Sequence, residues 1–152
     1  MNQQEILEKL RPLIREVTRA PEEKMGMDSH IMDDLGADSL DLLDLSFLVE
    51  KSFGITMSGH DFERIASRYL PSGVFEENGI LTDEAVAALR KVFPEVDGEV
   101  LAPGLRRLEL PRLLTVGVFA RLIELLLAER EGGGTRGNDE ARMTNDEEEG
   151  GG

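Results

Sequence analysis

The most constraining feature of the sequence is an apolar stretch near its C-terminal end. Residues 115–130 read TVGVFARLIELLLAER, and apolar side chains occupy most of the circumference of the helix that this stretch predicts. Arg121 and Glu124 are expected on the side of this helix that faces solvent. A helix that is apolar on nearly all sides is stable in water only when other elements bury it. We therefore expect a core helix within an all-α bundle.

A second helix is predicted near the N-terminal end. In residues 6–17 apolar side chains recur at steps of three and four, as on the buried face of an amphipathic helix. Pro12 lies inside this pattern and has no backbone donor, so we expect a kink or a late helix start there. The helix ends ahead of residues 21–37, which are rich in turn formers and predict a long loop.

Residues 38–53, DSLDLLDLSFLVEKSF, predict the clearest helix of the chain. Asp38 or Ser39 can cap its first turn, and Gly54 is a natural stop. Carboxylates crowd its N-terminal end, where the helix dipole favours negative charge.

This helix has two apolar faces, which lie roughly opposite each other on a helical wheel. The first face holds Leu42, Leu45, Val49 and Phe53, and the second holds Leu40, Leu43 and Phe47, flanked by Asp44, Glu50 and Lys51. A surface helix usually has one apolar stripe. The second face is therefore predicted to dock on a partner whose apolar pocket is rimmed by Lys and Arg. The alternative is that residues 58–111 cover it.

Residues 58–111 form an unusual middle segment with signals of their own. A short helix is predicted over residues 61–70, a turn at Asn78-Gly79, and a further helix over residues 83–93. Residues 94–111 are rich in Pro and Gly and are expected to be mostly loop.

The chain is strongly acidic, with 31 acidic and 17 basic residues and a formal charge of -14. From residue 129 onward there are 8 acidic and 3 basic residues, so that part carries -5 and residues 1–128 carry -9. Such a field repels nucleic acids and anionic lipids and attracts proteins with basic patches. Residues 131–152 are Gly-rich and acidic, which predicts a disordered tail.

The chain contains no cysteine, so any thiol that it uses must come from a prosthetic group. The N-terminal stretch lacks the apolar core of a secretory signal, and no apolar stretch is long enough to span a bilayer. The spacing of metal ligands is also missing. We expect a cytoplasmic monomer without a metal ion and without stable membrane insertion.

Three stretches carry a resemblance to a known family. LGADSLDLLDL at residues 35–45 resembles the phosphopantetheine attachment motif of acyl carrier proteins, whose centre is Asp-Ser-Leu. FGITM at 53–57 and TVGVFARLIELL at 115–126 resemble the family's sequence after its second helix and its last helix. The resemblance implies a carrier domain over residues 1–130, with three main helices, a short connecting helix, and an insertion at about 58–111.

The resemblance also implies a function. In such proteins a phosphopantetheinyl transferase moves 4′-phosphopantetheine from coenzyme A to the serine, here Ser39, and the group then holds acyl chains as thioesters. Asp38 and Leu40 match recognition positions beside the attachment site. The positions that match partner-facing residues are Asp41, Leu43, Asp44, Phe47 and Glu50. Lys51 departs from the family pattern, because an acidic residue is common there. The chain itself is expected to catalyse nothing, and acyl synthases and transferases with basic docking patches are the expected partners.

Other interpretations of the same residues remain open. Ser39 can be an ordinary helix cap, or a nucleophile with His30 or His60 as its base, although neither histidine lies in a recognisable signature. We expect both histidines to be surface residues. An unmodified carrier-fold protein can dock through the acidic helix without any prosthetic group. Aminoacyl and peptidyl carriers resemble Gly-Gly-x-Ser-Leu more closely, so the motif here favours fatty or polyketide-type acyl groups.

The predicted insertion falls where the family's acyl pocket is closed. We expect the helix at residues 83–93 to enlarge or cover this pocket through Val86, Leu89, Val92 and Phe93. This hypothesis favours a carrier for a specialised lipid or polyketide pathway. The alternative is a flap with no effect on cargo.

Overall fold

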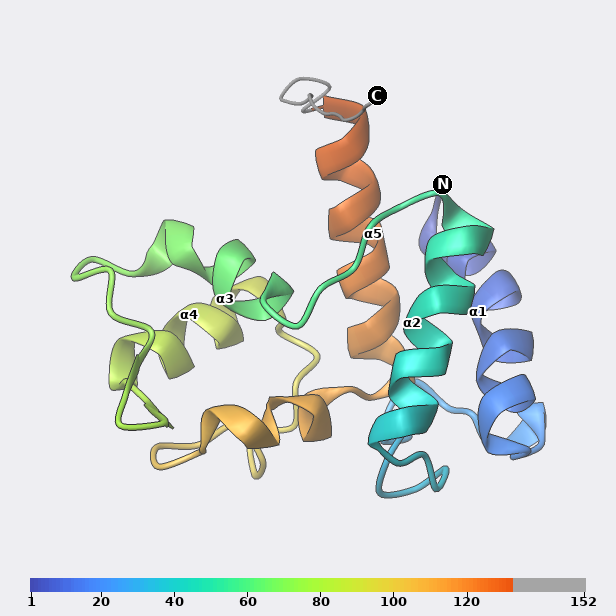
Figure 1. Ribbon diagram of the computed structural model, residues 1–152, viewed down its shortest axis with the longest axis horizontal. Coiled ribbons are helices and arrows are strands. Elements are labelled where there is room, and N and C mark those ends of the chain that lie inside the picture. Colours follow the sequence, from blue (N-terminus) through green and yellow to red (C-terminus); the bar gives the residue numbers. More distant parts are fainter. Residues whose placement is uncertain (133–152) are drawn as a thin grey trace.

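Three long helices dominate the protein, whose computed structural model describes residues 1–132 (Figure 1). They are α1 (Gln3–Thr18), α2 (Ser39–Phe53) and α5 (Val116–Gly132). α1 packs against both α2 and α5, and Figure 1 shows α5 between this pair and the middle segment. The predicted all-α fold is confirmed. Of the predicted tail, residues 131–132 belong to α5 and residues 133–152 lie outside the described part.

α1 runs without interruption through Pro12. A capping box starts it: Asn2 Oδ1 accepts from the backbone N–H of Glu5 at 2.9 Å, and the Glu5 carboxylate accepts from the N–H of Asn2 at 2.9 Å. The proline is exposed, on the face opposite the one that packs in the core. The late helix start that we considered is therefore wrong, because the cap and the buried face together hold the first turns in place.

The long loop between α1 and α2 is fixed to the start of α5. It includes one 3-10 turn, η1 (Glu22–Lys24). The N–H of Val116 donates to the carbonyl O of Ser29 at 2.9 Å, and the N–H of Gly117 donates to that of Met27 at 2.9 Å. A Cβ at Gly117 would lie 3.1 Å from the Met27 oxygen, so a glycine suits this close approach. The loop that leads to Ser39 thus has a defined position relative to α5.

The middle segment contains both helices that the sequence predicts. Its elements are α3 (Asp61–Ala66), η2 (Ser67–Tyr69), β1 (Glu76–Glu77), β2 (Ile80–Leu81), α4 (Asp83–Val92) and η3 (Arg107–Leu113). The predicted turn at Asn78-Gly79 joins two short strands into a hairpin, with φ of 56° and 82° at the two residues. We did not expect strands here. The loop expected to reach residue 111 ends earlier, because η3 begins at residue 107.

Arg107 holds three parts of the middle segment together. Its Nη1 donates to the carboxylates of Glu63 on α3 and Glu76 on β1, and its Nη2 lies 2.8 Å from Nδ1 of His60. The guanidinium also lies over the ring of Phe75, 5.9 Å from its centroid. The hydrogen bond to Glu76, followed by that to Glu63, raises the pKa of Arg107 above its usual value. η3 is therefore fixed to α3 through a guanidinium that stays charged.

Replacing Arg107 with alanine is expected to lower the free energy of unfolding by about 2 kcal/mol, because two carboxylates lose their shared cation and are left side by side. Urea unfolding at neutral pH measures this. The matched control is Arg106→Ala, since Arg106 is exposed and its guanidinium lies 3.7 Å from Glu109. That change is expected to cost less than about 0.5 kcal/mol. Equal losses in the two variants would show that Arg107 does not organise the segment.

Candidate functional site at the first turn of α2

Asp38, and not Ser39, caps α2. The Asp38 carboxylate accepts from the N–H of Asp41 at 2.8 Å, and the Asp41 carboxylate accepts from the N–H of Asp38 at 3.1 Å. Ser39 is the first helical residue and is exposed. Within residues 1–132 its hydroxyl has no hydrogen-bond partner among the protein's own groups. The interpretation of Ser39 as an ordinary cap is therefore wrong, and its hydroxyl is available for chemistry.

The turn ahead of Ser39 is organised around His30. Its backbone N–H donates to Asp34 Oδ2 at 2.7 Å, and its ring Nδ1 lies 3.2 Å from the same oxygen. The backbone hydrogen bond, with the side-chain hydrogen bond after it, lowers the pKa of Asp34 below its usual value. On the other side, His30 Nε2 lies 3.5 Å from a carboxylate oxygen of Asp97 in the middle segment.

The two histidines differ in their surroundings. The His30 side chain is only 16% exposed, so our expectation of a surface residue is wrong for it, whereas His60 is 78% exposed as expected. Within residues 1–132 the ring nitrogens of the two histidines lie beside Asp34, Asp97, Glu63 and Arg107, and neither ring is hydrogen-bonded to Ser39. In the described part of the chain, neither histidine is placed to act as the base that a nucleophilic serine needs.

One apolar face of α2 is buried in the structure, and the other is exposed. Leu45, Val49 and Phe53 are buried against the bundle. On the other face Leu40 is 71%, Leu43 52% and Phe47 58% exposed. The alternative that residues 58–111 bury this second face is therefore wrong.

The carboxylates along α2 also fall into two groups. Asp38 and Asp44 are exposed, although Asp38 also caps the helix. Asp41 and Glu50 are half-buried and hold the backbone in place: Asp41 completes the capping box, and Glu50 accepts from the N–H of Met57 at 2.7 Å. The sequence did not indicate this structural use of Glu50, because Met57 reaches it only after the chain turns at Gly54.

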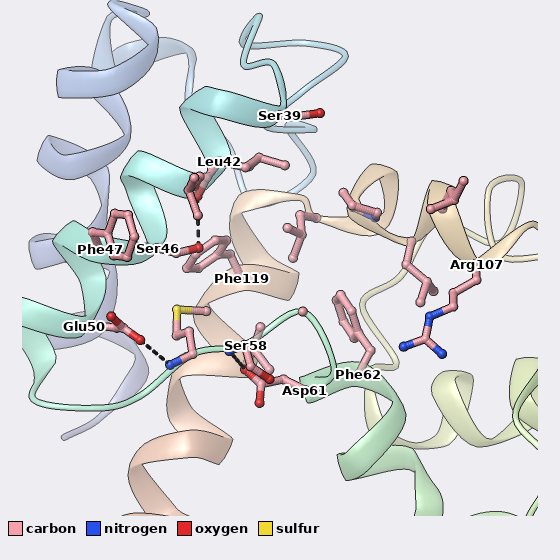
Figure 2. Close-up of a pocket in the computed structure, with 18 residues that line it drawn as sticks. Ser39, Leu42, Ser46, Phe47, Glu50, Ser58, Asp61, Phe62, Arg107 and Phe119 are labelled. Atoms are coloured by element: carbon pink, nitrogen blue, oxygen red, sulfur yellow. Dashed lines mark hydrogen bonds between the residues drawn. The ribbon is translucent and has the colours of Figure 1, made fainter.

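A groove of about 480 Å³ runs beside the exposed face of α2 (Figure 2). The residues that α2 contributes lie at helical spacing along one stripe, from the first turn to the last: Ser39, Leu42, Leu43, Ser46, Phe47 and Glu50. The other walls come from the chain after α2, from α3, from η3 and from α5; they are Met57, Ser58, Gly59, Asp61, Phe62, Arg107, Leu108, Leu110, Pro111, Leu114, Phe119 and Leu122. The hydroxyl-bearing residue thus stands at one end of a groove that follows its own helix.

The groove suits an apolar guest. Its main polar groups already have partners in the protein: Ser46 Oγ donates to the carbonyl O of Leu42 at 3.0 Å, and the buried Asp61 accepts from the N–H of Ser58 at 2.8 Å and from Arg64 at 3.0 Å. What remains is mostly aliphatic and aromatic surface, within the size range of small-molecule sites. The walls outside α2 were not predicted, because they come from elements that meet only in the folded chain.

Two classes of site find no support in the part of the chain that is described. No group of three or more His, Asp and Glu side chains is placed to hold a metal ion in residues 1–132. Over the same residues, each helix is too short or too polar to cross a bilayer.

Comparisons with known proteins point to one family. The model of the family described as "Phosphopantetheine attachment site" matches residues 8–67, from α1 through α3. Proteins named acyl carrier protein are 35% identical over 65 residues in Petrotoga mobilis and 37% over 67 in Cyanidium caldarium. These matches cover 43% and 44% of this chain and 76% and 78% of the relatives. In Thermotoga maritima the identity is 36% over 66 residues, which cover 43% of this chain and 82% of the relative. No solved structure matches the chain significantly.

Replacing Asp38 with alanine is expected to lower the free energy of unfolding by about 1 kcal/mol, because the N–H of Asp41 loses its acceptor. Urea unfolding followed by circular dichroism measures this. Asp44→Ala is the matched control, since Asp44 is an exposed carboxylate one turn into the same helix. We expect it to change stability by less than about 0.5 kcal/mol. A loss in the control as large as that in Asp38→Ala would contradict the capping role.

Proposed function

Because this chain belongs to the acyl carrier protein family, we propose that Ser39 carries its prosthetic group and that the chain presents acyl groups to a series of enzymes. The prosthetic group of the family is a covalently attached 4′-phosphopantetheine. When bound, it supplies a terminal thiol that holds acyl groups as thioesters. A chain without cysteine has no thiol of its own for this purpose.

One observation carries the assignment to Ser39: its hydroxyl is exposed at the first turn of α2 and has no structural task, since Asp38 caps the helix. The first N–H groups of an α-helix lack acceptors within the helix, and its dipole favours negative charge there. A phosphodiester on Ser39 would lie beside such groups. The residues present therefore fit the group, with Asp38 and Leu40 as its immediate neighbours.

The protein works with a phosphopantetheinyl transferase and with enzymes that handle acyl groups, as the family does. The exposed apolar face of α2, which is Leu40, Leu43 and Phe47, is the proposed contact for them. Asp38, Asp41, Asp44 and Glu50 give that side of the helix a negative charge, and a partner with Lys and Arg around an apolar pocket complements it. Because Asp41 and Glu50 also hold the backbone, Asp44 is the carboxylate most free to contact a partner.

The chain serves fatty acid, polyketide or specialised lipid synthesis; it catalyses nothing itself; and it acts in the cytoplasm. The apolar groove beside Ser39 supports the first, because a hydrocarbon chain gains free energy by leaving water there. An aminoacyl or peptidyl cargo would bring polar groups to a groove in which the polar side chains of Ser46 and Asp61 are already paired.

The test of attachment is incubation with coenzyme A and a transferase of broad specificity, followed by intact mass measurement. The wild-type chain is expected to gain the mass of one phosphopantetheine, and Ser39→Ala is expected to gain none. Ser46→Ala is the matched control, because Ser46 lines the same groove but donates to the backbone of α2; it should be labelled like the wild type. An unlabelled wild type, or labelling of Ser39→Ala, would leave only an unmodified protein that docks through its acidic helix.

The docking face has its own prediction. Replacing Phe47 with alanine is expected to lower kcat/KM of the same transferase about tenfold, because truncation of a central apolar contact commonly costs more than 1 kcal/mol at an interface. Ile80→Ala is the matched control, since Ile80 is also exposed but lies on β2, away from the groove lining. Equal rates for Phe47→Ala and the wild type would move the docking site off this face.

A further inference from the structure

The wall of the groove that faces α2 is built partly by the middle segment. Phe62 on α3 and Leu110 and Pro111 on η3 line it, and Phe119 of α5 lies between the two sides. Figure 2 shows Phe62 projecting from α3 on the side opposite Phe47. Phe62 is the bulkiest side chain that the middle segment contributes to the lining, and it is buried.

α4 contributes no residue to the groove lining, and its end packs behind Phe62. Our expectation that Val86, Leu89, Val92 and Phe93 would enlarge or cover the pocket directly is not met, because the lining includes none of them. Phe93 instead packs edge-to-face on Phe62, with centroids 5.2 Å apart and planes at 71°. It is fully buried at the end of α4, so it stands behind the Phe62 ring on the side away from the guest.

The surroundings keep this wall in place. Arg107 joins η3 to α3 through Glu63, the residue after Phe62. Arg64, on the other side of Glu63, pairs with Glu129 of α5 at 2.7 Å. With α3 fixed to both neighbours and Phe93 packed behind it, the ring has little room to withdraw from the groove.

We propose that Phe62 is a specificity-determining residue, which sets the size of the acyl chain that the groove holds, and that Phe93 is its positioning residue. The inference rests on the proposed function, since the guest is the apolar acyl chain carried at Ser39. It assigns to the middle segment a defined task, which is to supply a stiff aromatic wall for the cargo. Removing the ring makes room for a longer or bulkier chain, and enlarging it shortens the chain that fits.

The test uses the full-length protein, loaded by the broad transferase with acyl-coenzyme A from butyryl to palmitoyl. Loading at Ser39 is verified first by intact mass, so a failure of the proposed function is seen before cargo size is measured. The rate at which hydroxylamine releases each acyl group then measures how well burial in the groove protects its thioester from the reagent. Each methylene that the groove buries should slow release about fourfold, until the groove is full. In Phe62→Ala the slowing of release should continue to longer acyl chains than in the wild type. In Phe62→Trp it should stop at shorter ones.

Two further variants separate cargo size from stability. Leu89→Ala removes a fully buried side chain of α4 outside the groove lining, so it should lower stability and leave the chain-length series unchanged. Phe93→Ala should shift the series in the direction of Phe62→Ala, which a merely structural role would not do. If Phe62→Ala fails to fold, the same release rates are measured for Phe62→Leu, which also removes the ring. A series identical to that of the wild type in well-folded, fully loaded Phe62 variants would overturn the proposal.

Discussion

The burial of α5 is the constraint on which the rest of the structure depends. Its apolar side chains point in nearly all directions, and a single pair of neighbouring helices cannot cover them. α1 packs against it directly, and the middle segment is tied to it by Arg121 with Glu95 at 2.8 Å and by Arg64 with Glu129 at 2.7 Å. Where α2 and the middle segment face each other, they leave a groove. Phe119 and Leu122 of α5 are buried and form part of its lining, so the groove lies where one apolar helix is shared between two sets of neighbours.

The exposed face of α2, which is the proposed docking surface, combines apolar side chains with a strongly acidic chain. Three large apolar side chains along one helix favour association, and they lie on a chain with a formal charge of -14. Like charges keep copies of the chain apart while the same field attracts cationic surfaces. In the proposed docking role, the charge around the face would therefore select which apolar surfaces approach it. Ser39 lies at the N-terminal end of this face, where a protein bound to α2 would be within reach of the hydroxyl.

Local features were predictable from the sequence, and tertiary ones were not. The three long helices, the two faces of α2, the turn at Asn78-Gly79 and the start of α5 follow from periodicity and capping, which act over a few residues. The partners of His30 and Glu50 could not be predicted, because Asp97 and Met57 approach them only in the folded chain. For the same reason α4 was correctly expected to form, but its indirect route to the groove through Phe93 and Phe62 was missed. The proposed role of Ser39 came from a motif, and the structure adds that within residues 1–132 no local task competes for its hydroxyl.

The anchoring of the middle segment has a consequence for protein engineering. Its contacts with the rest of the chain are distributed: Asp97 faces His30 in the loop ahead of α2, Glu95 pairs with Arg121, and Arg64 pairs with Glu129 near the end of α5. A chimera that transplants residues 58–111 into another carrier would bring only half of each pair. The recipient would need a matching residue at each of three separate positions, two of them along its last helix. The segment, α5 and the loop that carries His30 therefore form one exchangeable unit, and recombination that keeps all three together should yield better-packed hybrids than replacement of the segment alone.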